Sequence, residues 1–174
     1  MMTVIYILAG IVLIILILGL MSPKNVTITR DILVERNPEQ VFEHLKSLKK
    51  QTEWSPWHDR DPNIIHEYKG DDGEIGSIHY WKGNKDVGEG EQEITALFPN
   101  HRIESELRFL KPWKATNVGF FEIKEKENQT KVIWGFSASY NFPMNAMMVF
   151  VNMNKFIGKD FEKGLKKFKK IIEE

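Results

Sequence analysis

Residues 157–172 read IGKDFEKGLKKFKKII, and this stretch decides the fold. Apolar side chains recur in it at steps of three and four residues, at Ile157, Phe161, Leu165, Phe168 and Ile172. That spacing predicts an amphipathic helix with one apolar stripe, while the lysines lie mostly on the other faces. We expect everything after Phe142-Pro143 to form one long helix, whose stripe needs an apolar surface to cover.

The segments before this helix supply such a surface, because they alternate like half-buried strands. Residues 102–110 alternate most clearly, with Ile103, Ser105, Leu107 and Phe109 on one face and Arg102, Glu104, Glu106 and Arg108 on the other. In residues 87–98 we place Gly88, Gly90, Gln92, Ile94 and Ala96 on the inner face. Further strands are predicted at 25–36, 64–69, 75–81, 115–124 and 131–140. An antiparallel sheet with one apolar face must have that face covered, and only the C-terminal helix can do it.

Two short helices are predicted between the first strand and the rest. Asn37 and Pro38 suit the N-cap and first position of a helix. A second short helix over residues 48–54 would end at Ser55-Pro56. The sequence therefore predicts an α+β fold: a curved antiparallel sheet of about seven strands wrapped on a long C-terminal helix, with two short helices after the first strand. Such an arrangement tends to enclose a cavity.

The N-terminus has a different character. Residues 4–21 read VIYILAGIVLIILILGLM, and no charged residue occurs before Lys24. An apolar run of about 18–20 residues can cross a bilayer as a helix. A signal peptide would normally begin with basic residues and end in a small-residue cleavage site, and a buried helix is rarely apolar all round. We predict a membrane anchor over residues 1–23 and a separate domain over 24–174. Lys24 and Arg30 follow the span, and the positive-inside bias places that domain in the cytoplasm.

Composition and motifs exclude several kinds of function. Basic and acidic residues number 24 each, a balance that disfavours nucleic-acid binding. The chain has no cysteine, which excludes disulfides, thiolate metal sites and cysteine nucleophiles. The five histidines show no metal-ligand spacing, and neither a phosphate loop nor a serine nucleophile elbow is present. We therefore predict no metal and no cofactor.

Several short motifs occur in a familiar order. They are listed here in sequence: Asn37-Pro38-Glu39-Gln40-Val41-Phe42, Trp54-Ser55-Pro56-Trp57, Gly76-Ser77, Trp81-Lys82-Gly83-Asn84, Val87-Gly88-Glu89-Gly90, Thr130-Lys131-Val132-Ile133-Trp134 and the stretch 157–165. Residues 25–174 resemble the START/Bet v 1-like (SRPBCC) superfamily, in its polyketide cyclase/dehydrase and lipid transport branch. The resemblance implies the helix-grip fold and a hydrophobic cavity for lipids, polyketides or similar ligands. It carries over no catalytic residue.

The candidate ligand cavity is built mainly from aromatic side chains. Its predicted lining is Trp54, Trp57, His66, Tyr68, His79, Trp81, Gly88, Gly90, Phe109, Phe121, Trp134, Phe136 and Met148. Aromatic and methionine side chains make broad, adaptable apolar walls, and glycines in a strand leave room beside the backbone. For any single residue, packing in an ordinary core is an equally good interpretation.

The stretch EWSPWHDRDP, residues 53–62, is expected at the mouth of this cavity. We interpret Trp54 and Trp57 as a stiff aromatic lip, and His58 to Asp61 as its solvated outer edge. Metal binding by His58 and Asp61 is disfavoured because no third ligand is evident.

The predicted function is a membrane-anchored binding domain for a hydrophobic or amphipathic small molecule, such as a lipid or a polyketide-like compound. Its partners would be that molecule and, through residues 4–21, the membrane. Two alternatives stay open. His66 or His79 could serve as an acid/base in an enzyme of the cyclase, dehydratase or hydrolase type. A filled core would instead indicate a protein-interaction or chaperone-adaptor module.

Overall fold

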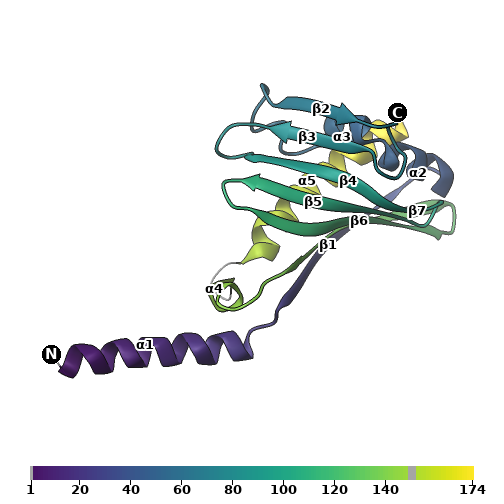
Figure 1. The fold of residues 1–174 in the computed structure, drawn as a ribbon. Helices are drawn as coiled ribbons and strands as arrows, with labels where there is room; N and C mark the ends of the chain where they lie inside the picture. The colour runs from purple at the N-terminus through teal and green to yellow at the C-terminus, as the bar shows by residue number, and fades with distance from the viewer. Residues whose placement is uncertain (1, 149–151) are drawn as a thin grey trace.

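The computed structural model describes residues 2–148 and 152–174 (Figure 1). Its elements, in chain order, are α1 (Met2–Met21), β1 (Asn25–Val34), α2 (Pro38–Lys46), α3 (Leu48–Trp54), β2 (Ile65–Lys69), β3 (Ile78–Lys82), β4 (Glu89–Phe98), β5 (Arg102–Lys111), β6 (Ala115–Lys126), β7 (Gln129–Ser139), α4 (Met144–Met148) and α5 (Met153–Glu173). All seven strands form one antiparallel sheet in the order β1-β7-β6-β5-β4-β3-β2. The last strand, β7, thus lies beside the first strand, β1. This is the predicted helix-grip fold.

The core lies between α5 and the inner face of the sheet, as the apolar stripe predicts. Phe161, Leu165 and Phe168 of α5 are buried, and Phe168 packs with Val34, Ile103 and other residues of the sheet. On β5, Ile103 and Ser105 are buried, whereas Arg102 on the outer face pairs with Glu104 and Glu122. Burial of one face therefore accounts for the alternation in residues 102–110.

Side-chain caps start the two short helices where the sequence predicts them. The Asn37 Oδ1 accepts a hydrogen bond from the Gln40 amide at 2.8 Å, and Pro38 follows it in the first turn. The Ser47 Oγ accepts one from the Lys50 amide at 3.1 Å, so α3 begins directly after α2 ends. Both caps satisfy amide groups that a helix leaves without partners.

The prediction of one continuous C-terminal helix is wrong. The segment after Pro143 forms the short helix α4, and a new helix, α5, begins at Met153. The Asn152 Oδ1 accepts a hydrogen bond from the Lys155 amide at 2.9 Å. Asparagine favours such a cap over a helix interior, which explains the second start.

The inner face of β4 also differs from the prediction, because the strand contains a bulge between Ile94 and Ala96. Beyond the bulge, Ala96 is paired with Glu104 and Leu97 with Ile103. Leu97, not Ala96, therefore packs against the core. One extra residue on a strand reverses the faces of all the residues that follow.

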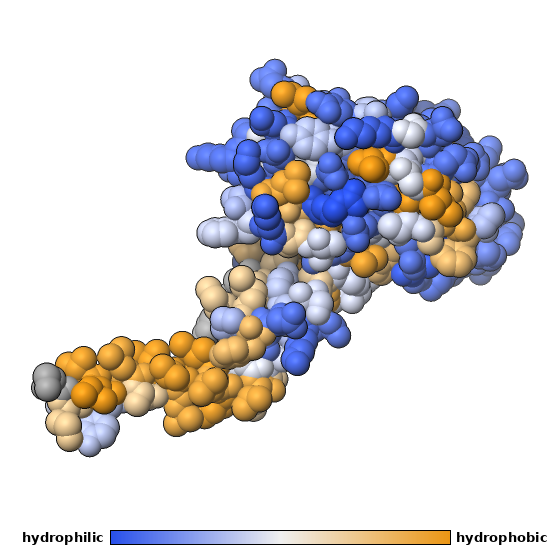
Figure 2. All heavy atoms as spheres, viewed as in Figure 1, coloured by the Kyte–Doolittle hydropathy of each residue, from blue (hydrophilic) through white to orange (hydrophobic). Residues whose placement is uncertain are grey.

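The helix α1 has 20 residues and is long and apolar enough to cross a membrane: a stretch of 18 residues within it has a mean hydropathy of 3.1, and only 6% of that stretch is buried. At about 1.5 Å per residue, its length is about 30 Å, which matches the hydrocarbon core of a bilayer. It projects from the rest of the molecule (Figure 1), and its apolar surface continues onto α4 (Figure 2). The Asn145 Nδ2 of α4 donates a hydrogen bond to the Gly19 carbonyl at 2.7 Å.

Candidate ligand-binding site

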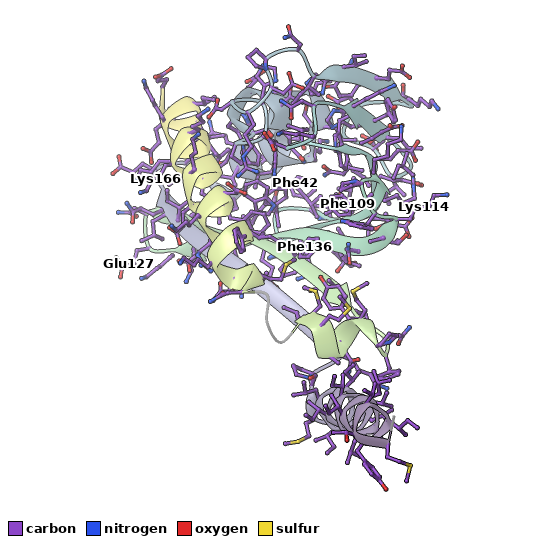
Figure 3. All side chains as sticks on the ribbon, turned by 90° about the vertical axis from the view of Figure 1, so that its left-hand side faces the viewer. Phe42, Phe109, Lys114, Glu127, Phe136 and Lys166 are labelled. Carbon is purple, nitrogen blue, oxygen red and sulfur yellow. The ribbon has the colours of Figure 1, made fainter. Side chains whose placement is uncertain are left out.

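A cavity of about 530 Å³ lies between α5 and the inner face of the sheet. Figure 3 shows two of its walls, with Phe109 and Phe136 in the space between the helix and the strands. Nine of the predicted residues line it, namely Trp54, Trp57, His66, His79, Trp81, Phe109, Phe121, Trp134 and Phe136. A volume of this size suits a small organic ligand.

The aromatic residues at the inner end of the cavity hold one another in place. Trp134 stacks on Phe161 of α5, with ring centroids 4.1 Å apart and an angle of 9° between the planes. Trp54 meets Trp134 edge to face at 5.1 Å and also contacts Phe121. Trp54 is only 1% exposed. It belongs to the core and not to the predicted lip. As the last residue of α3, it packs between the sheet and α5, in contact with Trp134 and Phe168.

Four predicted lining residues lie outside the cavity wall. Tyr68 stacks behind His79, with centroids 4.8 Å apart. Met148 belongs to α4, and Met153 at the start of α5 lines the cavity in its place. Gly88 and Gly90 do not line the cavity either.

The two glycines serve packing and backbone geometry. A Cβ at Gly90 would lie 2.5 Å from the Trp81 indole and 2.7 Å from the Arg108 carbonyl oxygen. Gly90 therefore makes room for Trp81, and the indole fills the space that we assigned to a ligand. Gly88 has a φ of +75° and lies against the Lys111 carbonyl, a conformation that other residues rarely adopt.

A polar patch on the wall interrupts the apolar lining. The Gln92 Nε2 lies 3.1 Å from Gln51 Oε1 and 3.3 Å from Ser105 Oγ, and it donates to both. Asn117 is buried and lines the cavity beside these groups on β6. The sequence analysis did not single out Gln51 or Asn117. The available signal for Asn117 was a polar residue at an inward position of an alternating strand, whereas Gln51 lies on α3 and no strand pattern indicates it.

His66 and His79 form a hydrogen-bonded pair in the same wall. Their Nδ1 and Nε2 atoms, respectively, are 2.8 Å apart. Burial, together with the neighbouring His66, lowers the pKa of His79 to about 4, and burial also lowers the pKa of His66, helped by the charge of His58. Both rings are therefore neutral at pH 7, with one N–H between them. The His66 Nε2 and the Trp54 Nε1 are buried without a hydrogen-bond partner among the described residues.

The stretch 53–62 separates into wall and rim. Trp57 lies on the wall, in contact with Trp134 and Phe161, while His58 is exposed to solvent. Asp59 pairs with Lys163 and Lys167 of α5.

Asp61 corrects the prediction of a solvated edge, because it is only 8% exposed. Its Oδ1 accepts from the Asn63 amide at 3.0 Å, and its Oδ2 accepts from the Asn84 amide at 2.6 Å. Asp61 thus fixes the turn after Pro62 and joins it to the β3–β4 turn. Among the described residues, no group of three potential metal ligands lies together.

The mouth of the cavity lies where the β5–β6 turn faces the first turns of α5. The lining residues there are Arg60, Pro112, Trp113, Tyr140, Met153, Phe156, Ile157 and Asp160. Arg60 and Asp160 form an ion pair across this edge. Trp113 and Phe156 are 81% and 68% exposed, respectively. The sequence analysis missed most of this set, because the strand pattern does not reveal which turn meets the start of the helix.

Comparison with protein families gives one match over most of the chain. The model for polyketide cyclase / dehydrase and lipid transport proteins matches residues 25–173, and the chain belongs to this family. Comparison with curated protein sequences gives no significant match.

Solved structures share the fold at low sequence identity. The Aha1 dimer from Colwellia psychrerythraea is 19% identical, with a TM-score of 0.60 over 85% of this chain and 96% of that one. Protein CV1439 from Chromobacterium violaceum is 12% identical, with a TM-score of 0.61 over 85% and 97% of the two chains. Mll3558 from Rhizobium loti is 14% identical, with a TM-score of 0.62 over 84% and 96%. The predicted superfamily and fold are confirmed.

Proposed function

We propose that this chain is a membrane-anchored binding domain for a hydrophobic or amphipathic small molecule, which it holds between α5 and the sheet. The observation that carries the proposal is the cavity of about 530 Å³ with its aromatic walls. A module with a filled core would leave no such space. Apolar burial would supply affinity at about 25 cal/mol for each Å² removed from water.

The polar patch narrows the kind of ligand. Gln51, Gln92 and Asn117 are neutral groups that donate and accept hydrogen bonds, and the nearby histidine pair is also neutral at pH 7. In an otherwise apolar cavity, these groups favour a ligand with a neutral hydroxyl, carbonyl or amide over one with a buried charge. A lipid or polyketide-like compound with one such group fits this description.

A matched pair of substitutions on β6 tests the cavity. Asn117→Phe places a large ring in the cavity, whereas Val118→Phe places the same ring on the outer face, where Val118 is 43% exposed. The full chain is purified in detergent and examined by native mass spectrometry for a co-purifying ligand. We expect ligand with the parent and with Val118→Phe, and none with Asn117→Phe. Circular dichroism checks that both variants are folded. The proposal would be refuted if the parent chain carried no ligand and added long-chain fatty alcohols did not change its melting temperature.

The anchor and its orientation are part of the same proposal. The apolar α1 and the basic residues Lys24 and Arg30 after it support a single-pass protein with its domain in the cytoplasm. If a protease added outside intact cells digests the domain, the domain faces the outside and the proposed orientation is wrong.

A catalytic function is the second candidate, and the histidine pair is the observation that favours it. A neutral imidazole whose Nε2 has no partner can accept a proton from a bound molecule. However, no carboxylate is hydrogen-bonded to either ring in the described part of the chain, so no group orients the pair for acid/base work. Once a ligand is known, unchanged product formation by a His66→Gln variant would remove this candidate.

A further inference from the structure

We propose that the mouth of the cavity lies on the membrane surface, so that the ligand passes between the cavity and the lipid of the adjoining leaflet without crossing water. The mouth surface consists of Trp113, Lys114, Lys155 and Phe156. The proposal rests on the membrane anchor of the proposed function, and three connections that lead from the anchor to the cavity support it.

The first contact connects the cavity wall to the end of the anchor. Tyr140 lines the cavity, and its backbone amide donates a hydrogen bond to the Lys24 carbonyl at 2.8 Å. Lys24 comes only three residues after Met21, the last residue of α1. A wall residue of the cavity is thus hydrogen-bonded to the short segment that leaves the span.

The second contact places α4 at the level of the lipid headgroups. Asn145 donates to the carbonyl of Gly19, and the Phe142 ring packs against the same glycine. Gly19 is in the last turn of α1, so a bilayer that holds α1 places α4 at the boundary between headgroups and acyl chains. The side chains of Phe142, Met144 and Met147 are 51%, 49% and 61% exposed, as this boundary favours.

The third connection runs from α4 to the mouth. Met148 ends α4 and Met153 begins α5, so the chain between them spans at most about 18 Å. Met153 and Phe156, in the first turn of α5, both line the mouth. Figure 1 shows that the β5–β6 turn and the start of α5 lie at the end of the sheet toward which α1 projects. Figure 3 looks onto that end, with α1 seen along its axis and the space between α5 and the sheet in view.

The chemistry of the mouth surface suits a bilayer interface. Exposed tryptophan is favoured at the level of the headgroups, and Phe156 adds apolar surface that water does not favour. Lys114 and Lys155 flank these rings and form no ion pair with any described residue, so they are available to anionic headgroups. The β6–β7 turn lies at the opposite end of the sheet (Figure 1) and is polar, with Glu127 and Asn128 exposed.

Site-directed spin labels test this position, and the absence of cysteine makes single labels simple to introduce. Trp113→Cys, Phe156→Cys and, as the far-end control, Asn128→Cys are each labelled in the full chain. Each is reconstituted into vesicles of phosphatidylcholine with phosphatidylglycerol. For each label, the rate of collision with lipid-soluble oxygen is divided by the rate of collision with a water-soluble nickel complex. We expect this ratio to be several-fold higher at positions 113 and 156 than at position 128. Equal ratios at the three positions would overturn the proposal.

The same vesicles test the path of the ligand. Transfer of a fluorescent long-chain fatty alcohol from the lipid to the protein is followed in the parent, in a Trp113→Asp/Phe156→Asp double variant and in Asn128→Asp. We expect several-fold slower transfer in the double variant alone. Transfer at the parental rate would overturn the direct path. A parent that takes up no probe refutes ligand binding, and the spin-label ratios still decide whether the mouth meets the membrane. A chain that does not float with the vesicles refutes the anchor.

Discussion

At the scale of single residues, His79 links the cavity wall to the pH dependence of stability. Its pKa is lowered to about 4 by burial and by His66, against 6.5 for an ordinary histidine. Between these values the unfolded chain binds more protons than the folded one, so the free energy of unfolding falls as the pH falls. From pH 7 to pH 5 this one group costs about 2 kcal/mol.

Urea unfolding at several pH values measures this loss. We expect a shallower decrease toward pH 5 in His79→Gln than in the parent. His101→Gln, which removes an exposed histidine, is measured under the same conditions as a control for the loss of an imidazole. Parallel curves for the parent and His79→Gln would mean that His79 does not titrate differently on folding.

Single residues also show the limit of sequence analysis. The strand pattern correctly placed Phe109 and Phe136 on the inner face, because alternation depends only on burial of one side. It could not show that Gly90 makes room for Trp81, since that depends on where an indole on the next strand lies. Likewise, the aromatic character of Trp54 predicted an apolar environment, but its depth is set by the end of α3.

At the scale of elements, the close approach of α5 to the sheet depends on Gly164. A Cβ at this position would lie 2.7 Å from the Trp134 ring and 3.2 Å from Pro56. Gly164→Ala should therefore lower the free energy of unfolding, because overpacking costs about 1–3 kcal/mol. The better helix propensity of alanine offsets about 1 kcal/mol of that cost.

The control for this prediction is Lys166→Ala, at an exposed position on the same helix. Urea unfolding should show little change in that variant and a clear loss in Gly164→Ala. A gain in stability for Gly164→Ala would mean that α5 can shift away from Trp134 without cost.

The elements themselves were largely predictable from the sequence. The caps at Asn37 and Ser47 and the alternating strands are local signals. The bulge at Ile94 depends on the pairing of β4 with β5, which a local pattern does not contain. The cap at Asn152 is a local signal for the start of α5, whereas the place of α4 depends on α1, a partner distant in sequence. The α4 helix packs beside α1, where the Asn145 side chain donates a hydrogen bond to the Gly19 carbonyl.

At the scale of the whole molecule, the apolar surface of α1 continues onto α4 (Figure 2), and this has a consequence that can be measured. Residues 24–174 without α1 would still carry the exposed side chains of Phe142, Met144 and Met147, together with Trp113 and Phe156 at the mouth. Their combined apolar area should hold the truncated domain on vesicles weakly and reversibly, without a span.

Flotation with vesicles of phosphatidylcholine and phosphatidylglycerol measures this residual binding. We expect residues 24–174 to float in part, and a Met144→Ser/Met147→Ser variant of the same segment to float markedly less. Ile65→Ser/Ile75→Ser removes exposed apolar side chains far from α4 and should float like the unsubstituted segment. Circular dichroism confirms folding in each case. If the methionine variant floats as well as the segment itself, α4 does not contact the membrane and α1 alone holds the protein there. The domain would then be connected to the bilayer only through α1, and a ligand would have to reach its cavity through water.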